Sequence, residues 1–161
     1  MAKKPKEEEK DTSIAVNRRA WHDYEVLEEI EAGVVLLGWE VKSIREKKVQ
    51  ITQAHIIIKH GEPLFIGAQI TPLLSASTHV NTDPTRTRKL LLRKAEIRRL
   101  IGAVERKGCT LIPLKMYWKR QFVKVRFALA KGKKNVDKRH DLKERDWTRQ
   151  KQRLGKLSQR G

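Results

Sequence analysis

The last 31 residues of this 161-residue chain cannot supply a hydrophobic core of their own. They hold 12 Lys and Arg against 4 Asp and Glu. Their clearly apolar residues are Val136, Leu142, Trp147, Leu154 and Leu157. Burying so few apolar side chains would not offset the conformational entropy lost when the segment becomes ordered. We therefore expect residues 131–161 to be a basic tail that is disordered alone and becomes helical on a partner, and the folded domain to precede it.

Positive charge extends beyond the tail. The chain has 37 Lys and Arg and 19 Asp and Glu, a formal net charge of +18, of which residues 14–130 carry +10 and the tail +8. Residues 1–13 are neutral overall and show no apolar periodicity, so we expect a disordered arm there. An excess of this size attracts polyanions, because Lys and Arg release the counterions of a phosphate backbone. Nucleic acid is the expected partner.

Several classes of protein are excluded by what the sequence lacks. No apolar run approaches the ~20 residues of a membrane helix, and the first 13 residues have no signal-peptide pattern, so a cytoplasmic protein without membrane contact is expected. Cys109 is the only cysteine, which excludes an intramolecular disulfide and a zinc site built on several thiolates. No phosphate-binding loop, dinucleotide motif or nucleophile motif occurs. We expect no catalytic residue, no metal and no cofactor.

Residues 14–130 have the pattern of one small domain rich in strands. Ile51–Lys59 and Pro63–Ile70 flank His60-Gly61-Glu62, a three-residue hairpin signal, and Gly33 is expected at a bulge or tight bend. Apolar residues at helical spacing predict one longer helix over Lys94–Lys107. In Phe122–Ala130, apolar and basic residues alternate, which predicts a strand with one apolar and one basic face. The fold class expected is mainly β, an OB-type antiparallel barrel with short flanking helices; a split sheet with helices on one side is the alternative.

Three places in this domain carry side chains suited to RNA. The segment DPTRTRK (residues 83–89) begins as a turn and projects three basic side chains, which is typical of a phosphate clamp, although an ordinary solvated turn has the same composition. His22 lies in the segment RRAWH, whose rings and guanidinium groups can stack on or hydrogen-bond to unpaired bases, although it could equally be bonded to the backbone. Glu31 is a carboxylate in basic surroundings and can accept hydrogen bonds from base amino groups.

Three longer motifs resemble one known family in consistent order and spacing. They are GWEVKSIR (Gly38–Arg45), DPTRTRKLLL (Asp83–Leu92) and GKKNVDKRHDLKERDW (Gly132–Trp147). They are similar to motifs of the small protein B family, also called SsrA-binding protein, from about Ile14 to Trp147. The resemblance implies an OB-type barrel and a bacterial, non-enzymatic adaptor. Such an adaptor binds transfer-messenger RNA (SsrA RNA) at its tRNA-like domain and delivers it to stalled ribosomes for trans-translation, which tags the nascent peptide and releases the ribosome.

The resemblance also implies which residues act. The RNA-binding set would be Asn17, Arg19, His22, Glu31, Arg86, Arg88, Lys89, Leu91, Lys124, Lys131, Lys133 and Lys134. The set that meets the ribosome's decoding centre and messenger path would be Gly132, Asp137, Lys138, Arg139, His140 and Trp147. Val136 departs from the family pattern, which commonly has His or Tyr there, and it has no aromatic ring to stack on a base. The implied partners are transfer-messenger RNA and the ribosome, with a monomer in a one-to-one complex with the RNA.

Two other functions stay open from composition alone. A general OB-fold ribosomal or tRNA-binding protein would have the same charge, and it would be incorporated into a ribosomal subunit through assembly. A small nuclease using Glu31 or Asp83 is the enzymatic alternative, but no metal-ligand or nucleophile pattern in the sequence supports it.

Overall fold

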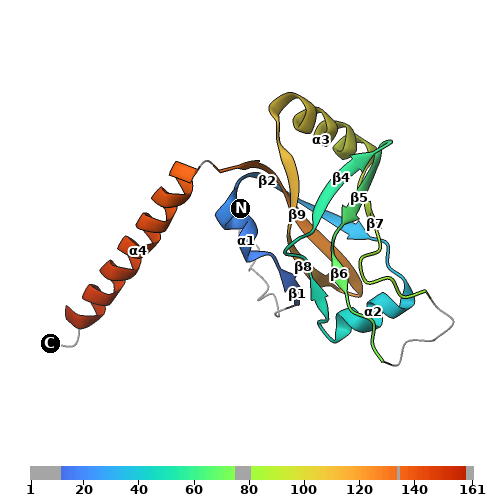
Figure 1. Cartoon of the computed structure of the whole chain (residues 1–161), viewed down its shortest axis with the longest axis horizontal. Coiled ribbons are helices and arrows are strands. Elements are labelled where there is room, and N and C mark those ends of the chain that lie inside the picture. Colours follow the sequence, from blue (N-terminus) through green and yellow to red (C-terminus); the bar gives the residue numbers. More distant parts are fainter. Residues whose placement is uncertain (1–11, 75–80, 134, 159–161) are drawn as a thin grey trace, which may run out of the picture.

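The computed structural model describes residues 12–74, 81–133 and 135–158. Figure 1 shows a compact β-rich body from which one helix extends. The elements in chain order are β1 (Ser13–Val16), α1 (Arg18–Asp23), β2 (Tyr24–Val34), α2 (Gly38–Arg45), β3 (Val49–Gln50), β4 (His55–Lys59), β5 (Glu62–Ile66), β6 (Gln69–Ile70), β7 (Arg88–Leu91), α3 (Lys94–Lys107), β8 (Thr110–Lys119), β9 (Phe122–Gly132) and α4 (Asn135–Ser158).

Six of the strands close into an antiparallel barrel. Their neighbours run in the order β8-β4-β5-β7-β2-β9, and β9 pairs again with β8, which completes the ring. Strand β8 pairs with β1 in addition to its two neighbours in the ring, β4 and β9. Strand β3 pairs with β6 in a separate two-stranded sheet. Closure leaves these six strands without a free sheet edge. The predicted mainly β, OB-type barrel is confirmed, and the split sheet is not what the chain forms.

Alternating side chains of β8 and β9 contribute to two apolar clusters. Val125 and Phe127 are fully buried in the main core inside the barrel. On the other side of the same strands, Ile112 and Ala128 pack with Ala20 of α1 in a smaller cluster. Because successive residues of a strand point to opposite faces, the basic residues of the first half of β9 remain at the surface, as the alternation predicted.

Two turns differ from the sequence-based expectation. The β4–β5 hairpin has a two-residue loop, His60-Gly61, and not three residues, because Glu62 already pairs with Lys59. Both loop residues have positive φ, 52° and 73°, as the favoured two-residue hairpin turns require. The bulge expected at Gly33 is wrong: Gly33 is paired on both sides, and the register of β2 shifts between Val26 and Glu28.

The helix expected over Lys94–Lys107 is confirmed as α3. Its Leu100 is fully buried in the main core. Gly108 follows in the left-handed conformation, with φ 62° and ψ 28°, and ends the helix in the usual way.

The C-terminal helix α4 extends away from the barrel (Figure 1). Of its apolar side chains, Leu142, Trp147 and Leu154 are 46%, 59% and 67% exposed, and no described residue of α4 belongs to either apolar cluster. The boundaries of the barrel differ slightly from those expected, since β1 begins at Ser13 and β9 continues to Gly132. That the tail is unfolded without a partner stays a prediction, and residues 1–11 of the expected arm lie outside the described residues.

Candidate nucleic-acid interface

A groove on the barrel brings together four side chains of the expected RNA-binding set. It has a volume of about 840 Å³ and lies where β2, β7 and β9 meet the start of α3. Its charged side chains and its exposed leucine are Glu31, Glu62, Lys89, Leu91, Arg93, Lys94, Glu96 and Lys124, and Lys89 Nζ lies 3.3 Å from Glu62 Oε1. These residues are far apart in the sequence, and it is the strand order β7-β2-β9 that makes them neighbours.

Strand β7 presents its residues alternately to the core and to the groove. Arg88 and Leu90 are buried, whereas Lys89 and Leu91 are exposed, Leu91 by 56%. On the neighbouring strand, Gly33 pairs with Leu91 on one side and with Lys124 on the other. An exposed leucine between two lysines offers a nucleic acid both an apolar surface and cations for its phosphates.

Glu31 is held as a carboxylate at the wall of the groove. The hydroxyl of Tyr117 donates a hydrogen bond to its Oε2, and Lys119 Nζ donates to Oε1 at 3.0 Å. Partial burial raises the pKa of Glu31, but these two hydrogen bonds and the charges of Lys119 and Lys124 outweigh it, so the pKa lies below its ordinary value. A carboxylate has about four acceptor positions. Glu31 therefore keeps acceptor capacity for amino groups of a bound RNA.

Sequence reasoning missed several residues of this groove. Arg93 and Lys94 line it next to the expected lysines, and a basic pair directly after the apolar run of β7 is the signal that could have indicated them. Tyr117 and Lys119, which hold Glu31, had no such signal. Tyr117 is 8% exposed and lies under the guanidinium of Arg126, 5.3 Å from the ring centre.

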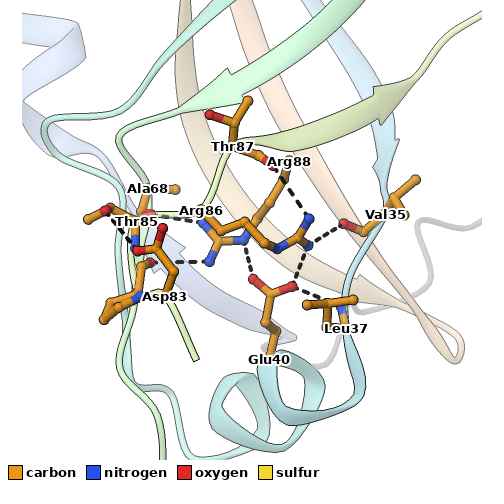
Figure 2. A network of polar contacts seen from close by, with 10 residues as sticks. Val35, Leu37, Glu40, Ala68, Asp83, Thr85, Arg86, Thr87 and Arg88 are labelled. Carbon is orange, nitrogen blue, oxygen red and sulfur yellow. Dashed lines mark hydrogen bonds and ion pairs between the residues drawn. The ribbon is translucent and has the colours of Figure 1, made fainter. Parts of the chain in front are cut away.

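The segment DPTRTRK is fastened to the barrel by Glu40 of α2 (Figure 2). Glu40 is 0% exposed, and its Oε1 accepts hydrogen bonds from Leu37 N at 2.8 Å and from Arg86 Nη2 at 2.5 Å. Its Oε2 accepts from Arg88 Nε. The same carboxylate thus caps the first turn of α2 and neutralises two arginines of the segment.

Arg88 connects three parts of the chain from inside the protein. Besides the ion pair with Glu40, its Nη1 donates to Ala68 O at 2.9 Å and its Nη2 to Pro84 O at 3.2 Å. Burial lowers the pKa of Arg88, and the hydrogen bond and charge of Glu40 oppose that shift. The expectation that Arg88 contacts RNA phosphate is therefore wrong, because its side chain is 0% exposed and its donors are directed inward.

Arg86 is only partly available. Its side chain is 29% exposed, and its Nη2 is shared between Glu40 and Val35 O, the latter at 3.3 Å. The turn before it is closed by Asp83, whose Oδ1 accepts from Thr85 N at 3.0 Å (Figure 2). Of the three basic side chains expected to clamp phosphate, Lys89 is the one that faces outward into the groove.

The residues expected at the start of the domain gather on α1, at the other end of β2. Arg19 is exposed and His22 is half-buried. Both lie close to the carboxylate of Asp23: Arg19 Nε is 3.5 Å from Oδ2, and His22 Nδ1 is 2.9 Å from Oδ1. Asn17 is 2% exposed, and its Nδ2 donates to Pro113 O at 2.9 Å. Asn17 thus ties α1 to β8, and it also lines a hollow of about 410 Å³ together with Arg19, so its part in RNA binding stays a prediction.

The residues expected in the tail divide between the end of β9 and α4. Lys131 and Gly132 are exposed at the end of β9, and Lys133 Nζ donates to Trp21 O at 3.2 Å. Lys134 lies outside the described residues, as do the side chains of Val136, Asp137, Lys138 and His140, whose backbone is part of α4. Arg139 and Trp147 are exposed, and Lys151 Nζ lies 5.2 Å from the centre of the Trp147 ring.

A second basic surface forms where α1 faces α4. Trp21, which is 43% exposed, lines a hollow of about 510 Å³ together with Lys133, Arg145 and Arg149. Neither Arg145 nor Arg149 belongs to the expected set. The described residues therefore gather basic side chains at two separate places, the groove on the barrel and the hollow between α1 and α4, each with acidic side chains among them.

Among residues 12–74, 81–133 and 135–158, no three His, Cys, Asp or Glu side chains are placed to hold a metal ion together. No helix within the described parts of the chain is long and apolar enough to span a membrane.

Comparison with known proteins points to one family. The model of a family described as SmpB protein matches residues 14–157. A chain in a solved structure described as "tmRNA-SmpB: a journey to the center of the bacterial ribosome" is 50% identical to this one; the match covers 74% of this chain and 84% of that chain, with a TM-score of 0.61. Since the family model spans the barrel and nearly all of α4, the chain belongs to the SmpB protein family.

Proposed function

We propose that the protein is an RNA-binding adaptor that binds transfer-messenger RNA at its tRNA-like domain and delivers it to stalled ribosomes for trans-translation. In this proposal the groove binds the transfer-messenger RNA, and α4 enters the messenger path and decoding centre of the ribosome. In this proposal the adaptor catalyses no reaction, works in the cytoplasm and binds its RNA as a monomer.

The observation that carries the proposal is that basic side chains gather at two separate places, the groove on the barrel and the hollow between α1 and the exposed helix α4. The groove is built on the closed barrel, whereas α4 leaves that barrel and keeps its apolar side chains exposed. A single RNA-binding surface would not need a long exposed helix, because such a helix adds no apolar burial to the fold. Membership of the SmpB protein family, together with the 50% identical chain described with transfer-messenger RNA and the ribosome, supports a proposal with two partners.

The proposal requires selective binding. The full chain should bind a transcript of the tRNA-like domain more tightly than bulk tRNA at moderate salt, since phosphate attraction alone does not distinguish the two. Filter binding or fluorescence anisotropy over a range of salt concentrations measures both affinities. Equal affinity for the two RNAs would support a general tRNA-binding protein and contradict the proposal.

The division of roles can be tested by removing the helix. The cut should follow Lys133, because β9 pairs with Tyr24 through Gly132 and Lys133 N donates to Asp23 O at 2.9 Å. The truncated chain should retain most of its affinity for the tRNA-like domain but should no longer support peptide tagging on stalled ribosomes. Loss of RNA affinity on truncation would show that α4, and not the groove, provides the main contact.

A further inference from the structure

The register of β7 is not determined by its apolar pattern. A strand shifted by one residue turns every side chain to the opposite face, and a clear alternation of apolar and polar residues normally prevents this shift. In this strand, however, Leu90, Leu91 and Leu92 follow one another. If β7 moved by one residue, Leu91 would take the buried position of Leu90, and the core would still contain a leucine at that point.

The residue that distinguishes the two registers is Arg88. In the observed register its guanidinium is buried and is neutralised by Glu40, which is itself 0% exposed. In the shifted register Lys89 would replace it inside, and a lysine cannot reproduce the planar set of donors that Arg88 directs at Glu40, Ala68 O and Pro84 O. A buried polar residue can specify register, because an alternative register leaves a buried polar or charged group without its partner.

The observed register also determines what the groove contains. With Arg88 inside, Lys89 and Leu91 are exposed to the groove beside Glu31 and Lys124. The backbone keeps this arrangement through pairs on both sides, such as Leu64 with Lys89 and Gly33 with Leu91. Strand β7 has only four residues, and Val35 N also donates to Lys89 O at 2.9 Å.

We propose that Glu40 is a positioning residue for RNA binding: by holding Arg88 inside the barrel it sets the register of β7, so that Lys89 and Leu91 face the groove. Glu40 itself is buried and touches no RNA. This inference rests on the proposed function, because it takes the groove as the RNA-binding surface.

The test compares the salt dependence of RNA binding among variants of the full chain. The probe is a transcript of the tRNA-like domain, and the variants are Glu40→Gln, Lys89→Gln, the two combined, and Glu40→Gln/Arg88→Leu. Each lost phosphate contact lowers the slope of log K against log salt by roughly 0.7–0.9. Glu40→Gln should lower the slope by about as much as Lys89→Gln does, and Lys89→Gln should cause little further change in the Glu40→Gln background.

Two further measurements separate positioning from a loss of stability. Leu111→Ala removes a buried side chain of β8, which is not a neighbour of β7, and should lower the urea midpoint while keeping the wild-type slope. Glu40→Gln/Arg88→Leu removes the buried cation together with its partner and leaves a leucine at the buried position 88. It should therefore recover both the urea stability and the wild-type slope, because a shifted strand would bury Lys89 in place of that leucine. This double variant also supplies the comparison if Glu40→Gln alone does not fold.

The outcomes are distinct. A wild-type slope in Glu40→Gln, a lowered slope in the double variant, or a Lys89→Gln slope equal to that of wild type would each overturn the inference. The comparison of slopes requires only that the wild-type chain binds the transcript, and not that it prefers this transcript to other RNAs. Preference for the tRNA-like domain over bulk tRNA is measured separately, so a failure of the proposed function can be recognised independently.

Discussion

The phenol of Tyr117 should lose its proton only at strongly alkaline pH while the protein is folded. Burial and the hydrogen bond to the negatively charged Glu31 raise the pKa of Tyr117 from 10.0 to about 12, and Arg126 opposes part of this shift. The experiment is a pH titration between about pH 9 and 13. It uses the variant Tyr24→Phe, because the chain has 2 tyrosines and this variant leaves Tyr117 as the only one.

The size of the effect follows from the shift. A pKa raised by about two units corresponds to 1.36 kcal/mol per unit, on the order of 2–3 kcal/mol of stability linked to the protonated phenol. Because the folded pKa lies above the unfolded one, this contribution is fully present below about pH 10 and is lost as the pH rises to about 12. Tyr117→Phe should remove this part of the pH dependence.

Tyrosinate absorbance near 295 nm measures the titration, and far-UV circular dichroism at each pH establishes that the chain is still folded. The midpoint should lie near 12 in Tyr24→Phe and near 10 for the same variant in urea. Glu31→Gln should lower the folded midpoint, because it removes the charge that opposes tyrosinate. A folded midpoint near 10, or a midpoint that Glu31→Gln does not move, would refute the assigned contact between Tyr117 and Glu31.

Two predictions concern stability. Glu40→Gln should lower the free energy of unfolding by about 3–5 kcal/mol, because it leaves a buried guanidinium without a counter-charge. The surface variant Glu28→Gln should lower it by less than about 1 kcal/mol. Urea titration measures both values, and equal losses would contradict the distinction between the buried and the exposed ion pair. Gly67→Ala should lower the melting temperature more than Gly61→Ala: both glycines have positive φ, but a Cβ at Gly67 would also lie 2.9 Å from the carbonyl oxygen of Gln53. Equal melting temperatures would mean that the backbone at Gly67 relaxes freely.

Local patterns in the sequence were sufficient where one element determines the outcome. The spacing of Ile97, Leu100, Ile101 and Val104 predicted α3 with both ends correct, because an amphipathic helix is recognised from its own residues. The alternation in β9 predicted a basic surface above a buried apolar face for the same reason.

The basic segment before β7 shows where such reasoning stops. Composition marked Arg86, Arg88 and Lys89 as equivalent cations, but only Lys89 lies in the groove. The distinction depends on where the strand begins and on Glu40, which precedes Arg88 by 48 residues. A contact over that distance is created by the topology of the barrel, and no local pattern in the sequence predicts it.

The groove likewise depends on pairing that the sequence does not display. Glu31 and Tyr117 are 86 residues apart and meet because β9 lies between β2 and β8. The resemblance to a known family placed Glu31, Leu91 and Lys124 in one RNA-binding set. The structure adds the hydrogen bonds that keep Glu31 ionised and the additional basic residues at the start of α3.

The attachment of Lys133 to the barrel determines where the reach of α4 begins. Its N–H is bonded to Asp23 O and its Nζ to Trp21 O, so the chain leaves the barrel from a fixed point immediately before α4. A helix of 24 residues is about 36 Å long, at 1.5 Å per residue. The number of residues in α4 therefore sets the greatest distance that its last turn can have from this point. Each residue inserted near the start of α4 would turn the rest of the helix by about 100° about its axis.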